Sequence, residues 1–287
     1  MTLIMSFSRF IFIGLVSTTL LIAACSSDGE DEVAVSGEGQ NAESRPPVED
    51  LYNRAANTLD QERFEEASRL FEEVERQYPY SKWATKAQLM SAYSAYKGQR
   101  YDEGVLALDR FIELHPGNED IDYAYYLRAL SFYEQISDVA RDQMMTELAL
   151  DSLNTLIRRF PDSRYTRDAT LKRDLTLDHL AGKEMEIGRY YLHRGHVNAS
   201  INRFRSVVKE YQTTTHIPEA LHRLVEAYLI LGLKTEATRV AAVLGHNYPG
   251  SKWYEDSYKI LDPELRKKLI DDRSFMDRTI DSLLRPN

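Results

Sequence analysis

The chain has 287 residues, and 36 lysines and arginines against 45 aspartates and glutamates give it a formal net charge of −9 at pH 7. A chain this acidic repels phosphate backbones, which argues against nucleic acid as a partner. Because the sequence holds a single cysteine, no disulfide can form within the chain, and stability must come from the packing of a composition that favours helices.

The N-terminal segment has the features of an export signal. An apolar run over residues 10–24 follows Arg9 and is short for a membrane-spanning helix. Its ending, Ile22-Ala23-Ala24-Cys25, resembles the lipobox of bacterial lipoproteins, in which the cysteine is acylated and the preceding peptide removed. We therefore expect residues 1–24 to be a lipoprotein signal peptide and Cys25 to carry diacylglycerol and a fatty acid. An uncleaved anchor, a free thiol and an intermolecular disulfide are the alternatives.

Residues 25–47 are predicted to be a flexible, lipidated tether, because they are rich in Ser, Asp, Gly and Glu and hold almost nothing to bury. In bacteria that sort lipoproteins by the residue after the cysteine, the non-acidic Ser26 favours the outer membrane.

A repeat of about 37 residues follows the tether. Small residues and a proline recur at matching positions: Ala55, Ala67 and Pro79, then Ala92, Gly104 and Pro116. Small residues let two antiparallel helices approach closely, and the proline ends the second helix. This pattern is typical of the tetratricopeptide repeat (TPR) and predicts an all-α solenoid of about five helix hairpins over 48–253. The expected hairpins are 48–81, 82–118, 121–163, 164–213 and 217–250. An irregular helical domain is the alternative.

Two segments depart from the repeat. Residues 165–182 are predicted to extend the first helix of the fourth hairpin into one long helix, with Gly182 as its weak point. Residues 254–287 are predicted to form a C-terminal helical extension, whose apolar residues Leu265, Leu269, Met276, Ile280 and Leu283 fall on one stripe. This extension either caps the last hairpin or docks a partner.

Three stretches carry a resemblance to a known family: 110–116 with its Phe-Ile-Glu-Leu-His-Pro ending, 160–166, and Tyr190-Tyr191 with Arg194-Gly195 and Asn202-Arg203. Over roughly residues 46–250 the chain resembles the BamD (ComL) family, lipoprotein subunits of the bacterial β-barrel assembly machinery. The resemblance implies a lipid anchor on the periplasmic face of the outer membrane of a Gram-negative bacterium.

The same resemblance implies partners. Members of the family hold a polypeptide-transport-associated (POTRA) domain of the barrel-inserting subunit BamA, bind other lipoproteins of the complex, and recognise the C-terminal signal of unfolded outer-membrane proteins. The alternatives are another lipid-anchored TPR adaptor, recruiting periplasmic proteases or cell-wall enzymes, and a glycan-processing enzyme.

Tyrosines recur at positions that line the concave face of a TPR array. Rings bury area with few rotatable bonds, and their hydroxyls can bond an extended peptide, while a lysine can receive its terminal carboxylate. The predicted substrate-peptide groove consists of Tyr52, Tyr93, Tyr96, Lys97, Tyr123, Tyr126 and Tyr133, with Lys86 and Glu134 on the same lines. The alternative is that these rings pack between hairpins.

Residues 158–212 hold twelve Lys and Arg against seven acids, a local charge of +5. Arginine stacks on rings and grips carboxylates, so Arg194 and Arg203 are our candidates for the POTRA interface that the family resemblance places in the C-terminal hairpins. A solvated basic face is the alternative.

No motif of catalysis was found: there is no Gly-rich phosphate loop, Gly-x-Ser-x-Gly or Cys-x-x-Cys. His193 and His196 are three apart but lack nearby acids of metal-ligand spacing. We therefore expect a protein with neither a catalytic site nor a metal, and with no cofactor beyond the N-terminal lipid.

Overall fold

The computed structural model describes residues 47–261 and residue 264. The predicted signal peptide, Cys25, almost all of the tether and most of the C-terminal extension lie outside the described residues. Within 47–261 the chain is helical and contains no strand, and none of its helices is long and apolar enough to cross a membrane.

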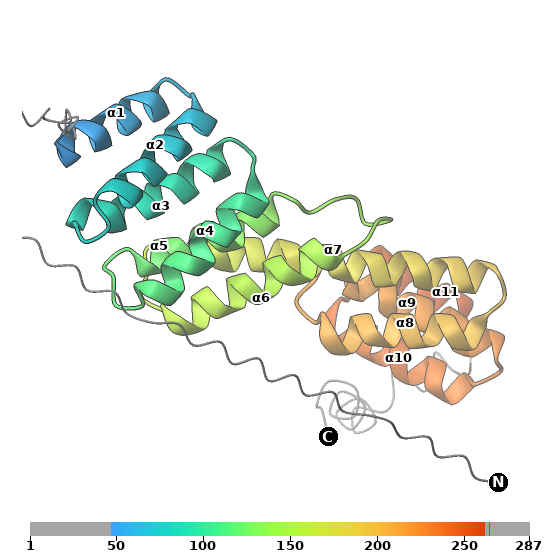
Figure 1. Ribbon diagram of the computed structural model, residues 1–287. Helices are drawn as coiled ribbons and strands as arrows, with labels where there is room; N and C mark the ends of the chain where they lie inside the picture. The colour runs from blue at the N-terminus through green and yellow to red at the C-terminus, as the bar shows by residue number, and fades with distance from the viewer. Residues whose placement is uncertain (1–46, 262–263, 265–287) are drawn as a thin grey trace, which may run out of the picture. The chain divides into compact units, whose positions relative to one another are not determined.

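The helices form five hairpins followed by one further helix (Figure 1). Each helix packs against the next one in the chain, and α11 packs against both α9 and α10. The described part of the chain therefore confirms the predicted all-α solenoid of helix hairpins. The helices are α1 (Val48–Asp60), α2 (Phe64–Gln77), α3 (Lys82–Lys97), α4 (Tyr101–Leu114), α5 (Ile121–Tyr133), α6 (Met144–Arg159), α7 (Thr166–His193), α8 (Val197–Glu210), α9 (Ile217–Ile230), α10 (Lys234–Asn247) and α11 (Lys252–Ile260).

The small residues of the repeat lie where helices approach most closely. Ala55 and Ala67 are fully buried in the first hairpin, beside the ring of Phe71. The turns within hairpins also repeat: Gly195 and Gly232 adopt positive φ angles of 78° and 71°, a conformation that glycine reaches without strain. The periodicity in the sequence thus reports real packing positions.

A hexapeptide that follows the first and last hairpins is nearly the same in both places: Tyr-Pro-Tyr-Ser-Lys-Trp at 78–83 and Tyr-Pro-Gly-Ser-Lys-Trp at 248–253. α2 ends just before Pro79 and α10 just before Tyr248-Pro249, because the residue preceding a proline is disfavoured in a helix. Ser81 and Ser251 then cap the following helices, their hydroxyls accepting from the backbone N–H groups of Ala84 (3.1 Å) and Tyr254 (3.3 Å). The hexapeptide therefore ends one helix and starts the next.

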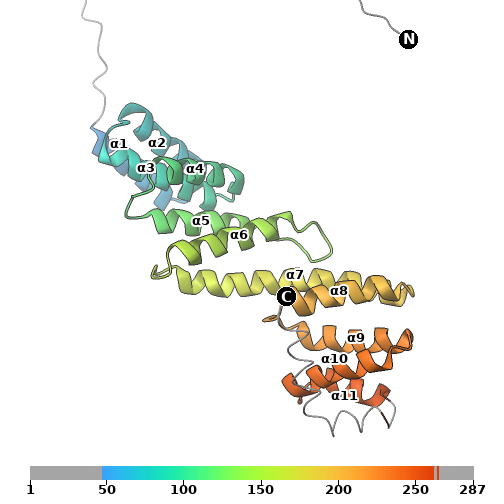
Figure 2. The same cartoon turned by 90° about the horizontal axis from the view of Figure 1, so that it is seen from below.

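The predicted long helix is present. α7 runs for 28 residues without a break, packing on α6 and, further along, on α8 (Figure 2). It continues through Gly182, where an added Cβ would lie 3.2 Å from Nε2 of His216. The glycine at this position makes room for that imidazole.

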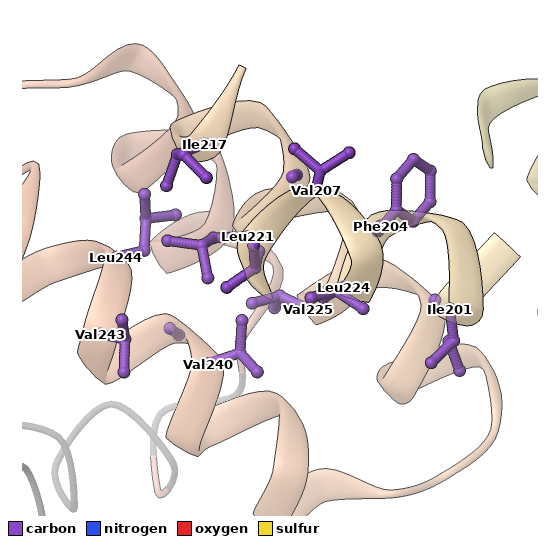
Figure 3. Close-up of a cluster of buried hydrophobic side chains, with 14 of the residues drawn as sticks. Ile201, Phe204, Val207, Ile217, Leu221, Leu224, Val225, Val240, Val243 and Leu244 are labelled. Atoms are coloured by element: carbon purple, nitrogen blue, oxygen red, sulfur yellow. The ribbon is translucent and has the colours of Figure 1, made fainter. Parts of the chain in front are cut away.

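The largest described core lies in the C-terminal hairpins, where side chains of α8, α9 and α10 interlock (Figure 3). Phe204 is fully buried there, and its ring lies so close to Gly188 that an added Cβ would be 2.4 Å away. This contact joins α8 tightly to α7.

Candidate functional site

The first helices of successive hairpins bring several predicted tyrosines together. α5 contacts both α3 and α7. The ring of Tyr165, just before α7, stacks on Tyr126 with centroids 4.8 Å apart, and its centroid lies 5.2 Å from that of Tyr123. Tyr93 and Tyr96 of α3 pack on the same core cluster as Tyr123. We call Tyr93, Tyr96, Tyr123, Tyr126 and Tyr165 the tyrosine surface.

Charged side chains of α7 lie at the edge of the tyrosine surface. The hydroxyl of Tyr126 donates a hydrogen bond of 2.6 Å to Oδ2 of Asp168. The same oxygen lies 3.5 Å from Nζ of Lys172, which in turn sits 5.0 Å from the centre of the Tyr133 ring. Tyr133 is therefore linked to the tyrosine surface through a lysine that also offers a positive charge.

Three hydroxyls of this surface, those of Tyr96, Tyr123 and Tyr126, have pKa values raised above the ordinary value of tyrosine. Burial, the nearby Glu134 carboxylate and a hydrogen bond to it raise the pKa of Tyr96 to about 12. Burial likewise raises the pKa of Tyr123, and burial together with the hydrogen bond to Asp168 raises that of Tyr126. Because the Tyr126 hydroxyl already donates to Asp168 and the Tyr96 hydroxyl is bonded to Glu134, each of these two groups offers a peptide backbone a hydroxyl oxygen that can accept from an N–H.

Two predicted groove residues lie away from the tyrosine surface. Tyr52 is 7% exposed and packs between Phe71 and Trp83, with ring centroids 5.3 and 4.8 Å away. Lys97 is exposed at the end of α3, with its Nζ 6.0 Å from the centre of the Phe64 ring. Tyr52 thus acts in core packing, and Lys97 faces the first hairpin.

The structure adds three residues that sequence reasoning did not assign to the groove: Tyr165, Asp168 and Lys172. The repeat could have pointed to these residues, because α5 and α7 are the first helices of successive hairpins. The long loop between Tyr133 and Met144 shifts the 37-residue register, so counting 37 residues on from α5 does not lead to the matching positions of α7.

The two candidate arginines occupy different parts of the fourth hairpin. Arg194 follows the end of α7, exposed, with its guanidinium carbon 5.4 Å from the centre of the Tyr190 ring. Nη1 of Arg203, on α8, donates to both carboxylate oxygens of Glu184 at 3.2 Å. Since Glu184 and Arg194 are ten residues apart on α7, the two arginines are separated by roughly 15 Å along the helix axis.

Among residues 47–261, no group of three or more His, Cys, Asp or Glu side chains is arranged to hold a metal ion. His193 and His196 are both exposed at the turn between α7 and α8. The described residues instead form an aromatic patch with hydroxyl groups, the tyrosine surface, and a hairpin with accessible guanidinium groups, those of Arg194 and Arg203.

The stacked hairpins define a helical-repeat protein of the TPR class. Residues 45–244 match the profile of the YfiO family, described as an outer membrane lipoprotein. The chain belongs to this family, the BamD family of outer membrane lipoproteins.

Relatives named outer membrane protein assembly factor BamD cover most of the chain. The protein of Caulobacter vibrioides is 52% identical over 215 residues, which are 75% of this chain and 70% of the relative. That of Rickettsia prowazekii is 48% identical, over 75% of this chain and 86% of its own. A Neisseria meningitidis protein is 33% identical over 254 residues, 85% of this chain and 93% of the relative.

Proposed function

We propose that this protein is a non-catalytic scaffold of the outer-membrane β-barrel assembly machinery, anchored by lipid on Cys25 to the periplasmic face of the outer membrane. The observation that carries the proposal is the family match over residues 45–244, with relatives that are named assembly factors for outer membrane proteins. A stack of hairpins with a tyrosine surface suits the role, because such folds present extended binding faces.

The proposed substrate is the C-terminal signal of an unfolded outer-membrane protein, and the proposed site is the tyrosine surface. An extended segment has unpaired backbone N–H and C=O groups and alternating apolar side chains. The tyrosine rings offer apolar area to the side chains, and the hydroxyl oxygens of Tyr96 and Tyr126, whose protons are bonded to Glu134 and Asp168, can accept from the backbone N–H groups. Lys172 is a better candidate than Lys97 to receive the terminal carboxylate, because it lies beside Tyr133 at the edge of the tyrosine surface, whereas Lys97 lies over Phe64 of the first hairpin.

The substrate site is tested by photo-crosslinking a C-terminal barrel peptide to the full-length, detergent-purified protein. Tyr93→Ala combined with Tyr126→Ala should lower crosslinking about tenfold, since a central aromatic contact is worth roughly 1–2 kcal/mol. Tyr80→Ala combined with Tyr190→Ala is the matched control, because both rings are exposed and lie outside the tyrosine surface. Equal crosslinking by the two double variants would refute this site.

The proposed POTRA interface uses Arg203 and Arg194. Arg203 keeps 43% of its side chain exposed while paired with Glu184, so it can contact a partner's carboxylate without leaving its own hairpin. Arg203→Glu should reduce co-purification of the β-barrel subunit from solubilised outer membranes. Arg205→Glu, an exposed arginine on the same helix, is the matched control and should leave recovery unchanged.

Co-purification from solubilised outer membranes also tests the scaffold role as a whole. We expect the wild-type chain to recover a β-barrel protein with POTRA domains and other lipoproteins of the complex. Recovery of periplasmic proteases or cell-wall enzymes in their place would reject the proposal in favour of another lipid-anchored adaptor. Mass spectrometry of the mature N-terminus should find diacylglycerol and a fatty acid on Cys25, and an unmodified cysteine would reject the anchor.

A further inference from the structure

A groove lies in the C-terminal half of the described chain, bordered by α7, α9 and the end of α11, with a volume of about 580 Å3. Two of its apolar side chains are unusually accessible: Ile230 is 63% exposed and Ile260 is 44% exposed. Leu192 and Leu229 also line it. We call these four residues the C-terminal groove. An apolar surface of this kind normally has an occupant.

The charged groups at the edge of the C-terminal groove already have partners. Nη1 of Arg223 donates to Oε2 of Glu226 at 2.7 Å, and Nη1 of Arg189 lies 3.1 Å from Oε1 of Glu219. The rim is therefore close to electrically neutral, and the groove suits an apolar stripe better than it suits a strongly charged ligand.

The chain itself continues from the edge of this groove. Ile260 lines the groove, and Leu261 is 1% exposed with an extended backbone (φ −74°, ψ 139°) that ends α11. Leu265, the first apolar residue of the predicted stripe, is five residues beyond Ile260. At roughly 3.3–3.6 Å per residue it can lie up to about 17 Å from that side chain, which allows it to enter the groove.

The sequence of the segment matches the groove. Residues 265–287 contain six basic and four acidic residues, which give the segment a small net charge of +2. Its apolar residues recur at the spacing of one helix face: Leu265, Leu269, Met276, Ile280 and Leu283. The tether to Leu261 raises the effective concentration of this stripe to the millimolar range, far above that of a free partner.

We propose that residues 265–287 bind back onto the chain and place their apolar stripe in the C-terminal groove. A separate apolar helix, from a partner or from a second copy, would have to displace this segment to reach the same groove. The inference rests on α7, α9 and α11 alone and does not require the proposed assembly function.

Disulfide trapping in the full-length, detergent-purified protein tests the placement. Ile230→Cys is combined in turn with Leu269→Cys, Met276→Cys or Leu283→Cys, and peptide mass spectrometry identifies bridges after mild oxidation. We expect an intrachain bridge in at least one pair. Tyr80→Cys with the same three residues is the control and should give none, and single-cysteine variants report any bridge to Cys25.

The same three residues are also paired with Glu255→Cys on α11. Three outcomes overturn the proposal: no bridge to position 230 in any pair, bridges only between two chains, or bridges only in the Glu255→Cys pairs, which would make the segment a cap over α11. A second measurement uses trypsin, which cuts after Lys268, Arg273 and Arg278. Cleavage there should become at least about tenfold faster in Ile230→Asp, because the cleavage rate follows the fraction of molecules in which residues 265–287 have left the groove. Cleavage should be unchanged in the control Leu106→Asp, whose side chain is exposed on α4. Equal cleavage in both variants would also reject the docking.

Discussion

Gly188→Ala is the sharpest test of the packing between α7 and α8. An added Cβ would lie 2.4, 2.8 and 2.9 Å from three carbons of the Phe204 ring, which is fully buried in the core. Overpacking of a filled core costs about 1–3 kcal/mol, while replacing glycine by alanine inside a helix gains about 0.8–1 kcal/mol. We expect a net loss of about 1 kcal/mol in the free energy of unfolding.

Gly104→Ala is the matched control. Gly104 is the small residue of a second helix, α4, where the nearest neighbours to an added Cβ are the Ala92 carbonyl oxygen at 3.5 Å and the Tyr96 nitrogen at 3.6 Å. These are ordinary contacts, and the first hairpin already holds Ala67 at this position. Only the helix gain remains, so Gly104→Ala should stabilise the protein by up to about 1 kcal/mol.

Urea unfolding followed by far-ultraviolet circular dichroism measures both variants. The transition midpoint should fall for Gly188→Ala and rise for Gly104→Ala, with unchanged slopes. The reasoning is refuted if Gly188→Ala stabilises the protein as much as Gly104→Ala does, because the ring would then have to yield at no cost.

Three further changes test the candidate sites. Tyr126→Phe removes the hydrogen bond to Asp168 and should lower the free energy of unfolding by about 1 kcal/mol in urea melts. The folded protein raises the pKa of Tyr96 from 10.0 to about 12, so the stability that the Tyr96 hydroxyl contributes is complete below pH 10 and is lost as the pH rises towards 12. Tyr96→Phe should reduce this loss of stability at alkaline pH, as followed by circular dichroism. Arg203→Ala should change stability by less than about 1 kcal/mol, as for an exposed pair with Glu184, while co-purification of the barrel subunit falls.

The fold was predictable because its determinants are local and repeat. Small residues at matching positions, together with the prolines that end second helices, indicate where helices touch and where they stop. α7 was also predictable as one long helix, since Ala169, Leu171, Leu175 and Leu180 extend the helical pattern into the fourth hairpin. What the pattern did not indicate is that Gly182 accommodates His216, because this contact joins residues 34 positions apart.

The candidate sites were only partly predictable. Their partners are carboxylates and lysines, residue types common on every solvated helix, and the rotation between hairpins decides which of them meet. Asp168 and Glu184 therefore emerged only from the structure. Tyr52 is different, because its counterpart 37 residues later in the repeat is Leu89, an apolar residue that is also buried. The repeat therefore already indicated that position 52 packs in the core.

The two proposed binding sites share α7. Asp168 supports the tyrosine surface near its start, and Glu184 holds Arg203 sixteen residues later, roughly 24 Å along the axis. The helix is continuous, and Gly182 between them is closed in by His216, so α7 has no obvious second conformation. Communication between bound substrate and a bound partner requires an element with two states. Coupling between the two proposed sites would therefore have to pass through the packing of neighbouring hairpins against α7, where α5 contributes the Tyr126–Asp168 contact and α8 the Arg203–Glu184 contact.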